Sequence, residues 1–111
     1  MACEDGHASV VELLLASSGI DVNQATTDDG ATPIYAACYS GYTEIVAMLL
    51  ARVEVDTNKA RTDDGATPLS TACYHGHTEI VGMLLARDEI DANQARTDNG
   101  ATPLSTACYN G

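Results

Sequence analysis

The sequence lacks tryptophan and phenylalanine altogether, and tyrosine, with five copies, is its one large aromatic residue type. Its apolar core must therefore come from aliphatic side chains. Basic residues are also scarce, since five Lys and Arg stand against 16 Asp and Glu, which gives a net charge of −11. This balance argues against nucleic acid, whose phosphates require clusters of Lys and Arg. It argues equally against binding to an anionic membrane surface.

Long apolar segments are missing as well. No run approaches the ~18 residues that a membrane-spanning helix needs, and no charged-then-apolar signal peptide opens the chain. We therefore expect an intracellular chain, cytoplasmic or nuclear.

Motifs for catalysis or cofactor binding are absent too. The sequence has no Gly-rich phosphate loop, no calcium loop of the D-x-D-x-D-G type and no convincing Ser/His/Asp or Cys/His arrangement. The paired aspartates at 28–29 and 63–64 are expected on exposed turns, where solvent keeps their pKa values alike, whereas acid–base catalysis needs them to differ. We expect neither an enzyme nor a cofactor.

What the sequence does contain is a unit that recurs every 35 residues. The spacing is seen in two sets of residues: Gly6, Gly41, Gly76 and Gly111, and Cys3, Cys38, Cys73 and Cys108. A fixed period in this range indicates a stacked-repeat protein. We divide the chain into a partial repeat at 1–26, complete repeats at 27–61 and 62–96, and a partial repeat at 97–111.

Each complete repeat predicts a turn followed by two helices. In the second complete repeat, residues 63–65 (Asp-Asp-Gly) have the composition of a turn. Thr67 and Pro68 then predict a helix start, and Gly76 predicts its end.

A second helix is expected to begin at a Thr78 cap, with an apolar stripe on one face. A polar loop follows at 88–96. In the first partial repeat, residues 1–6 are expected to be the end of a first helix that stops at Gly6, with a separate second helix after it.

The resemblance to a known family rests on a pattern that recurs in register along the whole chain. In the second complete repeat the pattern reads Gly65-x-Thr67-Pro68-Leu69-x-x-Ala72, Gly76-His77-x-Glu79-Ile80-Val81, Leu84-Leu85 and Asp91-x-Asn93. It resembles the ankyrin repeat, which is usually about 33 residues long and has the signature T-P-L-H-x-A. Tetratricopeptide repeats, at about 34 residues, do not explain a turn followed by a Thr-Pro helix start.

The resemblance implies an all-α fold: an ankyrin-repeat solenoid of stacked helix-turn-helix units joined by long hairpin-like loops. Two features depart from the family pattern. Tyr35, Ser70 and Ser105 replace the signature His, and each unit is two residues longer than usual.

The resemblance also implies where a partner would bind. In ankyrin proteins the turn tips and the exposed side of the first helix line a concave surface that contacts protein partners. Carried over to this chain, the partner-binding residues are Asp28, Asp29, Tyr39, Ser40, Asp63, Asp64, Tyr74, His75, Asp98, Asn99, Tyr109 and Asn110. The chain is then expected to be an acidic, Tyr-bearing interaction module, with a basic protein partner.

Two alternatives remain open. The aspartates can be simple turn formers, and the near-identical repeats can form a structural spacer with no dedicated partner. Neither end of the chain shows the polar outer face of a capping repeat, so we expect a segment of a longer array. Uncapped ends also predict end-to-end self-association.

The cysteines and histidines suggest a metal or disulfide site only at first sight. Helices stack about 8–10 Å apart, whereas a disulfide needs Cα atoms within roughly 7 Å. We therefore expect four buried, reduced thiols. The motif Cys73-x-His75-x-His77 does not recur in the other repeats, so no metal site is expected. His77 is expected to tie the turn between the two helices.

Overall fold

The computed structural model describes residues 2–17 and 19–110, and the side chains of 8–17 and 19–109. These residues form six helices and no strand. The helices are α1 (Ala2–Ala16), α2 (Pro33–Ser40), α3 (Thr43–Leu50), α4 (Pro68–Tyr74), α5 (Thr78–Leu85) and α6 (Pro103–Asn110). The all-α fold class is confirmed.

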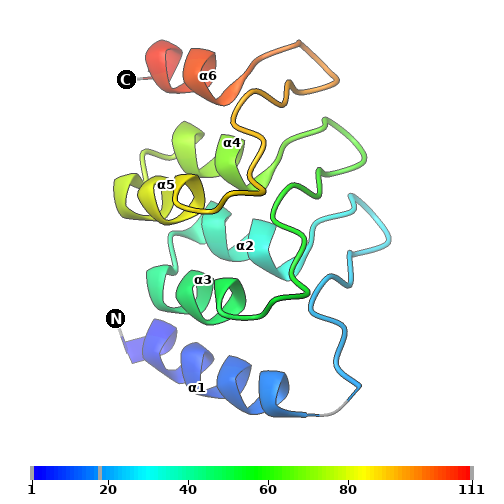
Figure 1. Ribbon diagram of the computed structural model, residues 1–111, viewed down its shortest axis with the longest axis vertical. Coiled ribbons are helices and arrows are strands. Elements are labelled where there is room, and N and C mark those ends of the chain that lie inside the picture. Colours follow the sequence, from blue (N-terminus) through cyan, green and yellow to red (C-terminus); the bar gives the residue numbers. More distant parts are fainter. Residues whose placement is uncertain (1, 18, 111) are drawn as a thin grey trace.

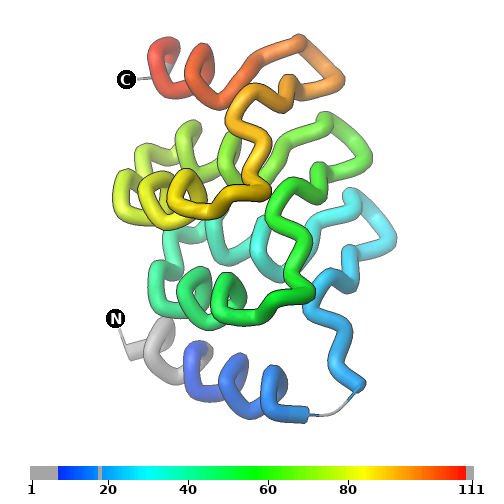
Figure 2. The backbone as a smooth tube through the Cα atoms, in the orientation of Figure 1, coloured from blue at the N-terminus to red at the C-terminus, as the bar shows by residue number. Residues whose placement is uncertain are grey.

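The helices stack in two columns (Figure 1). One column consists of the first helices of the repeats, α2, α4 and α6; the other consists of α1, α3 and α5. The loops that lead into α2, α4 and α6 project on the same side and follow nearly the same path in successive repeats (Figure 2). The stack is 38 Å long, with α1 and α6 at opposite ends (Figure 1).

The first helix of each repeat begins at the Thr-Pro pair, as predicted. Thr32 and Thr67 are N-caps whose hydroxyls accept hydrogen bonds from the backbone N–H three residues later, and proline fills the first helical position. Gly41 ends α2 in the left-handed conformation, with φ 78°. The second helices begin where predicted, although Thr78 is the first helical residue of α5, after His77 as N-cap.

The prediction for the first partial repeat is wrong. α1 runs without a break from Ala2 to Ala16, through Gly6, where a helix end was expected. Each residue added to an existing helix gains one backbone hydrogen bond, so the segment before Gly6 continues the helix and does not end at the glycine. The place that a first helix would occupy beside α2 is therefore not filled by these residues.

The core lies between the two columns and is aliphatic, as the composition required. Six large aliphatic side chains of the core, each at most 2 % exposed, come from both columns: Ile34, Val46, Leu49, Leu69, Ile80 and Leu84. Fully burying one such side chain stabilises the fold by roughly 1.5–3 kcal/mol.

Polar side chains join neighbouring repeats along the loops. The Asn23 amide donates to the Glu54 carbonyl oxygen and accepts from the Asp56 N–H. Asn58, 35 residues later, makes the same two bonds with Glu89 and Asp91. These bonds fix the spacing of the repeats.

Arginines add a second set of links. Arg52 donates to the carbonyl oxygen of Leu15 near the end of α1, and Arg87 donates to that of Leu50 at the end of α3. Each arginine thereby satisfies a carbonyl group that a helix C-terminus leaves without an intrahelical partner. No helix among the described residues has the length and apolarity needed to span a bilayer.

Candidate functional site

The side of the first-helix column that faces the loops carries three shallow hollows, one at each repeat. Their volumes are about 330, 200 and 330 Å³ from the α2 end to the α6 end. They share equivalent positions of the 35-residue unit: Asp29, Asp64 and Asn99; Ala31, Ala66 and Ala101; and Tyr39, Tyr74 and Tyr109. We call this row of hollows the concave face.

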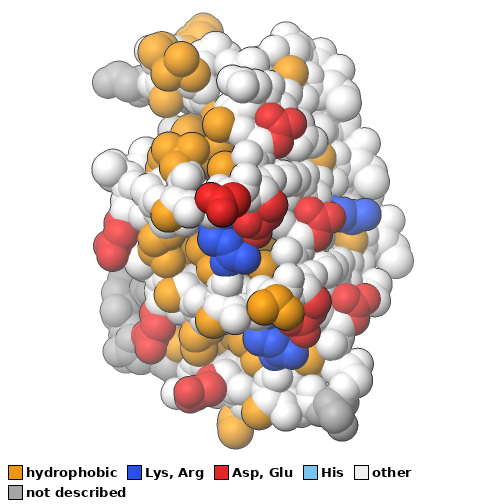
Figure 3. All heavy atoms as spheres, in the orientation of Figure 1, with side chains coloured by type: hydrophobic (Ala, Val, Ile, Leu, Met, Phe, Trp, Pro, Cys, Tyr) orange, Lys and Arg blue, Asp and Glu red, His pale blue; other side chains and the backbone are white. Residues whose placement is uncertain are grey.

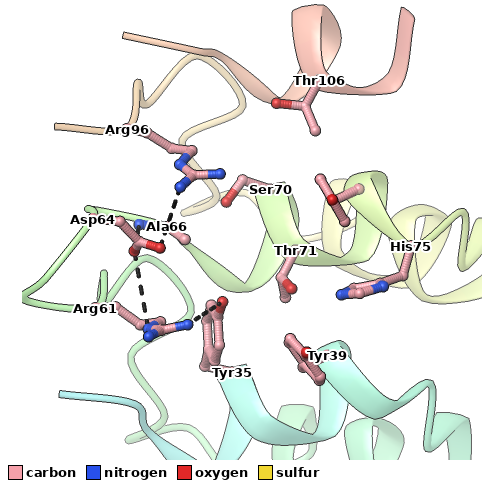
Figure 4. Close-up of a pocket in the computed structure, with 11 residues that line it drawn as sticks. Tyr35, Tyr39, Arg61, Asp64, Ala66, Ser70, Thr71, His75, Arg96 and Thr106 are labelled. Atoms are coloured by element: carbon pink, nitrogen blue, oxygen red, sulfur yellow. Dashed lines mark hydrogen bonds and ion pairs between the residues drawn. The ribbon is translucent and has the colours of Figure 1, made fainter. Parts of the chain in front are cut away.

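The central hollow lies between α2 and α4 and reaches α6 (Figure 4). Tyr35 and Tyr39 point into it from α2, Thr71 points into it from α4, and so does His75, the residue that caps the end of α4. The loops contribute Arg61, Asp64 and Arg96. This hollow is therefore built from three successive repeats.

An aromatic cluster forms one side of the central hollow. The His75 ring lies edge-on to Tyr39 of the preceding repeat, with ring centroids 4.5 Å apart, and to Tyr74, with centroids 5.0 Å apart. Exposure of the tyrosines rises along the stack, from 49 % at Tyr39 and 53 % at Tyr74 to 91 % at Tyr109. Large amphipathic rings with this much free surface are suited to contact a partner.

Arginines and aspartates alternate along the loop side of the concave face. Arg61 is 3.2 Å from Asp29, 2.6 Å from Asp63 and 3.9 Å from Asp64. Arg96 is 3.3 Å from Asp64 and 2.7 Å from Asp98. Several aspartates of the expected acidic surface are therefore paired with arginines.

The loop before α2 has Thr26 at the position where the loops before α4 and α6 have Arg61 and Arg96. The Thr26 hydroxyl donates to the Asp29 carboxylate over 2.6 Å. This bond, together with the Ala31 N–H, lowers the pKa of Asp29 below its usual value, and Arg61 contributes further. Asp29 therefore stays ionised in the neutral range.

Charge is mixed on other parts of the surface too. On the face shown in Figure 3, the basic side chains lie beside acidic ones. Two ion pairs among the described residues lie outside the concave face. Arg52 is 2.8 Å from Glu54, and Arg87 is 2.9 Å from Glu89.

The structure brings together some of the predicted partner-binding residues and separates others. The hollows are lined by eight of them, of which seven are Asp29, Tyr39, Ser40, Asp64, Tyr74, His75 and Asn99. Tyr109 also lines the third hollow. Asp28, Asp63 and Asp98 lie on the exposed turns outside the hollow linings, and the side chain of Asn110 lies outside the described residues.

The main residues that sequence reasoning missed are Arg61 and Arg96. Each stands directly before the Thr-Asp turn, 35 residues apart, in a chain with only five basic residues. That recurrence was the available signal. Tyr35 was noted only as a replacement for the signature His; it is buried, and its hydroxyl accepts a hydrogen bond from Arg61 over 3.3 Å.

The other replacements of the signature His act locally. The Ser70 hydroxyl and the Thr67 hydroxyl each accept a backbone N–H from the other residue, which is a capping box at the start of α4. Ser105 and Thr102 make the same exchange at α6.

His77 binds a different turn from the one predicted. Its Nε2 is 3.3 Å from the carbonyl oxygen of Tyr39 in the preceding repeat. The imidazole also packs so closely on Gly41 that a Cβ there would lie 2.7 Å from it. His77 is therefore a link between repeats.

The cysteine prediction is confirmed at Cys38 and wrong at Cys108. Cys38 is fully buried, and burial raises the pKa of its thiol from 9.0 to about 12. Cys73 is half-buried with a raised pKa, and Cys108 is exposed, because no described helix follows α6 to cover it. The side chain of Cys3 lies outside the described residues.

Within the described part of the chain, no three His, Cys, Asp or Glu side chains are grouped as metal ligands would be. The Cys73, His75 and His77 side chains do not form such a group. The imidazoles of His75 and His77 instead stack with centroids 5.8 Å apart.

Comparison with known proteins agrees with this architecture. The family model described as ankyrin repeats (3 copies) matches residues 1–60 and 53–111, which together span the whole chain. A search of curated proteins finds no match. The chain therefore belongs to the ankyrin repeat family, whose repeats generally serve as protein–protein interaction modules.

Proposed function

We propose that the chain is a protein-interaction module that binds a cationic segment of a partner protein along its concave face. The observation that carries this proposal is the recurrence of one hollow in three successive repeats, each beside an exposed tyrosine. A row of equivalent hollows suits an elongated segment that places side chains at regular intervals.

The charge of the face supports a cationic partner. Its loop side carries five aspartates, at 28, 29, 63, 64 and 98, against Arg61 and Arg96. Two arginines shared among several carboxylates reduce the negative potential without cancelling it. Surface charges of this kind act mainly on the rate of association, and salt screens them over about 10 Å at 0.1 M.

The tyrosines supply contact area. Burying an exposed aromatic ring contributes more than a rim charge, and aromatic residues are enriched among those that dominate binding energy. We therefore assign the lifetime of the complex to Tyr39, Tyr74 and Tyr109, and its rate of formation to the aspartates.

A random peptide library selected on the chain tests this proposal. Enriched peptides should carry Lys or Arg, and the triple variant Tyr39→Ala, Tyr74→Ala, Tyr109→Ala should lose most of their affinity through faster dissociation. Asp28→Asn with Asp63→Asn should slow association with little effect on dissociation. The matched control, Glu44→Gln with Glu79→Gln, removes the same charge from the exposed starts of α3 and α5 and should change neither rate markedly.

A structural spacer is the second candidate function. The specific observation in its favour is that many polar groups between repeats bond to the neighbouring repeat, as Asn58, Arg61 and His77 do. The same selection separates the two. Peptides that bind the triple tyrosine variant as well as the unmodified chain, or a library that yields no binder, contradict the interaction proposal and favour the spacer.

A further inference from the structure

The hollows of the concave face recur at the spacing of the stacked first helices. α2 packs against α4, and α4 against α6. Packed helices lie about 8–10 Å apart. The His75 ring bridges this interval between two equivalent tyrosines, with its centroid 4.5 Å from that of Tyr39 and 5.0 Å from that of Tyr74. A segment that binds along the row must therefore present equivalent side chains at about 8–10 Å.

This interval distinguishes between the regular conformations that a bound segment can adopt. In a β-strand, side chains on one face recur every second residue, at about 6.6 Å. In an α-helix, a side chain recurs on the same face after seven residues, at about 10.5 Å. In a polyproline II helix, it recurs after three residues, at about 9.3 Å. Only the polyproline II repeat lies within the interval that the stacked helices set.

Each hollow has the size of a single side chain. The volumes, about 200 Å³ for the central hollow and 330 Å³ for the other two, lie at or below the lower end of the roughly 300–1,000 Å³ of small-molecule sites. The hollow at α2 has Tyr39 and Ala31 as apolar lining and Asp29 as its carboxylate, and the central hollow has the equivalent residues. Lys and Arg suit such a hollow, because their aliphatic stems pack on apolar surface while the charge stays at the tip.

Arg61 makes this combination of contacts within the chain itself. Its guanidinium carbon lies 5.4 Å from the centroid of the Tyr35 ring, and its Nη2 is 3.2 Å from the Asp29 carboxylate. A cation over a tyrosine ring is attracted by the negative face of the ring. Tyr39, four residues further along α2, is 49 % exposed and offers a second ring to a cation from outside.

We propose that the partner segment is a basic, proline-rich stretch in the polyproline II conformation, with Lys or Arg at every third residue. This inference rests on the proposed function and adds the conformation and the spacing of the segment. Its basic side chains enter successive hollows, each with its stem against a tyrosine and its charge beside the loop carboxylates. Its prolines pack on the aromatic strip of Tyr39, His75 and Tyr74, as such segments do in other aromatic-lined grooves.

The hollow at α6 differs from the other two in one group. Asn99 stands at the position of Asp29 and Asp64, so an amide replaces the carboxylate. The Asn99 side-chain oxygen accepts a hydrogen bond from the Ala101 N–H over 2.9 Å, as the Asp64 carboxylate does from Ala66. The turn therefore keeps its geometry with either residue. We expect this hollow to discriminate less between Lys and a neutral Gln than the other two do.

Two peptides of identical composition test the spacing. One repeats Lys-Pro-Pro three times; its isomer is Lys-Pro-Lys-Pro-Lys-Pro-Pro-Pro-Pro. Both carry the same charge and are held in polyproline II by proline, but only the first presents all its lysines on one face. Calorimetric titration of the 111-residue chain at low salt should show about tenfold tighter binding of the Lys-Pro-Pro peptide, because only this peptide engages several hollows at once. A Lys-Gly-Gly peptide should bind more weakly, since a flexible chain must be ordered first.

Opposite substitutions at one position of the repeat test where the lysines bind. Asp64→Asn should weaken the Lys-Pro-Pro peptide about threefold, and Asn99→Asp should strengthen it by a similar factor. Both variants should change the binding of the isomer much less, so the isomer is the control for general charge effects. Both residues already occur in this turn, and circular dichroism checks that the fold is retained.

The outcomes separate this inference from the proposed function. Equal binding of the two isomers, or tighter binding of the rearranged one, overturns the three-residue spacing. If the triple tyrosine variant then loses both peptides, the cationic partner stands and only its conformation and spacing fall. Tighter binding of an alanine-rich helical peptide with Lys at every seventh residue also overturns the inference. If none of these peptides binds at low salt, the inference and the proposed function are both contradicted.

Discussion

The Arg61 guanidinium donates a hydrogen bond to the Tyr35 hydroxyl oxygen over 3.3 Å, across the boundary between two repeats. The same side chain holds Asp29 of one turn and Asp63 of the next. The bond to Tyr35 is the largest of the effects that raise the pKa of Arg61 above its usual value. Arg61 is therefore a link between repeats that also lines the concave face.

Arg61→Ala should lower the free energy of unfolding by about 1–2 kcal/mol, because the buried Tyr35 hydroxyl loses its donor and two turns lose a shared cation. Arg61→Lys should recover only part of this loss, since an ammonium group lacks the planar fork of a guanidinium. Urea unfolding measures both. Lys59→Ala removes a positive charge from an exposed residue two positions away, and a comparable loss in that control contradicts the assignment.

The asparagine bridge gives a second comparison within one chain. Asn58→Ala should destabilise the protein by about 1–3 kcal/mol, because it removes the bonds to Glu89 and Asp91, both 2.7 Å long. Asn93→Ala alters the equivalent, exposed residue, which has no described repeat after it, and should cost less than about 0.5 kcal/mol. Hydrogen exchange of loop amides should show the difference at Asp91. Equal effects on stability would mean that the bridge contributes little.

Alanine substitutions at two equivalent glycines distinguish the effect of backbone strain on stability from the effect of a steric clash. Gly65 and Gly100 have φ of 74° and 73°, so alanine at either position costs about 1–2 kcal/mol in strain. At Gly65 the new Cβ would also lie 2.6 Å from the Thr97 backbone nitrogen, whereas at Gly100 nothing lies within 4 Å. Gly65→Ala should therefore lower the melting temperature clearly more than Gly100→Ala. Similar decreases in melting temperature for the two variants would show that the turn at Gly65 can move away from Thr97 without loss of stability.

The Cys38 thiol predicts a dependence of stability on alkaline pH. The pKa of this thiol is about 12 in the folded state, against an ordinary value of 9.0. Its contribution to the free energy of unfolding is therefore complete below pH 9 and declines as the pH rises toward 12. The decline should be about 1.4 kcal/mol per pH unit. Cys38→Ala should remove that part of the slope in urea unfolding series. A slope unchanged by the substitution would show that the thiol ionises freely in the folded protein.

Thiol labelling offers an independent measurement of the same burial. Cys108 should react first in the native state, Cys73 more slowly, and Cys38 only on unfolding, because the thiolate is the reactive form and burial suppresses it. Mass spectrometry of partly labelled protein gives the order. Early labelling of Cys38 would contradict its burial.

Local sequence predicted the features that depend on a few neighbouring residues. The Thr67-Pro68 helix start and the helix end at Gly76, which has a positive φ of 70°, were predicted correctly because caps and turns are decided within one helical turn. The unbroken course of α1 was not predicted, because a break at Gly6 depends on whether a complete first helix packs beside it. The conformation of that segment depends on tertiary contacts.

The concave face was predicted in position but not in charge. Tyr39, Tyr74 and His75 lie where the family pattern placed them, because their positions follow from the helix register. The pairing of Asp64 with Arg96 joins residues 32 positions apart, so it emerges only when repeats are stacked. Sequence reasoning that treats one repeat at a time cannot see such pairs.

The links between repeats can form only in a certain order while the chain is being synthesised. Arg52 bonds to Leu15, 37 residues earlier, and Asn58 is completed by Glu89, 31 residues later. During synthesis the chain leaves the ribosome from its N-terminus, so each repeat waits for almost one further repeat before its links can form. Folding on the ribosome must therefore follow translation with a lag of about one unit, and the newest repeat is always the incomplete one.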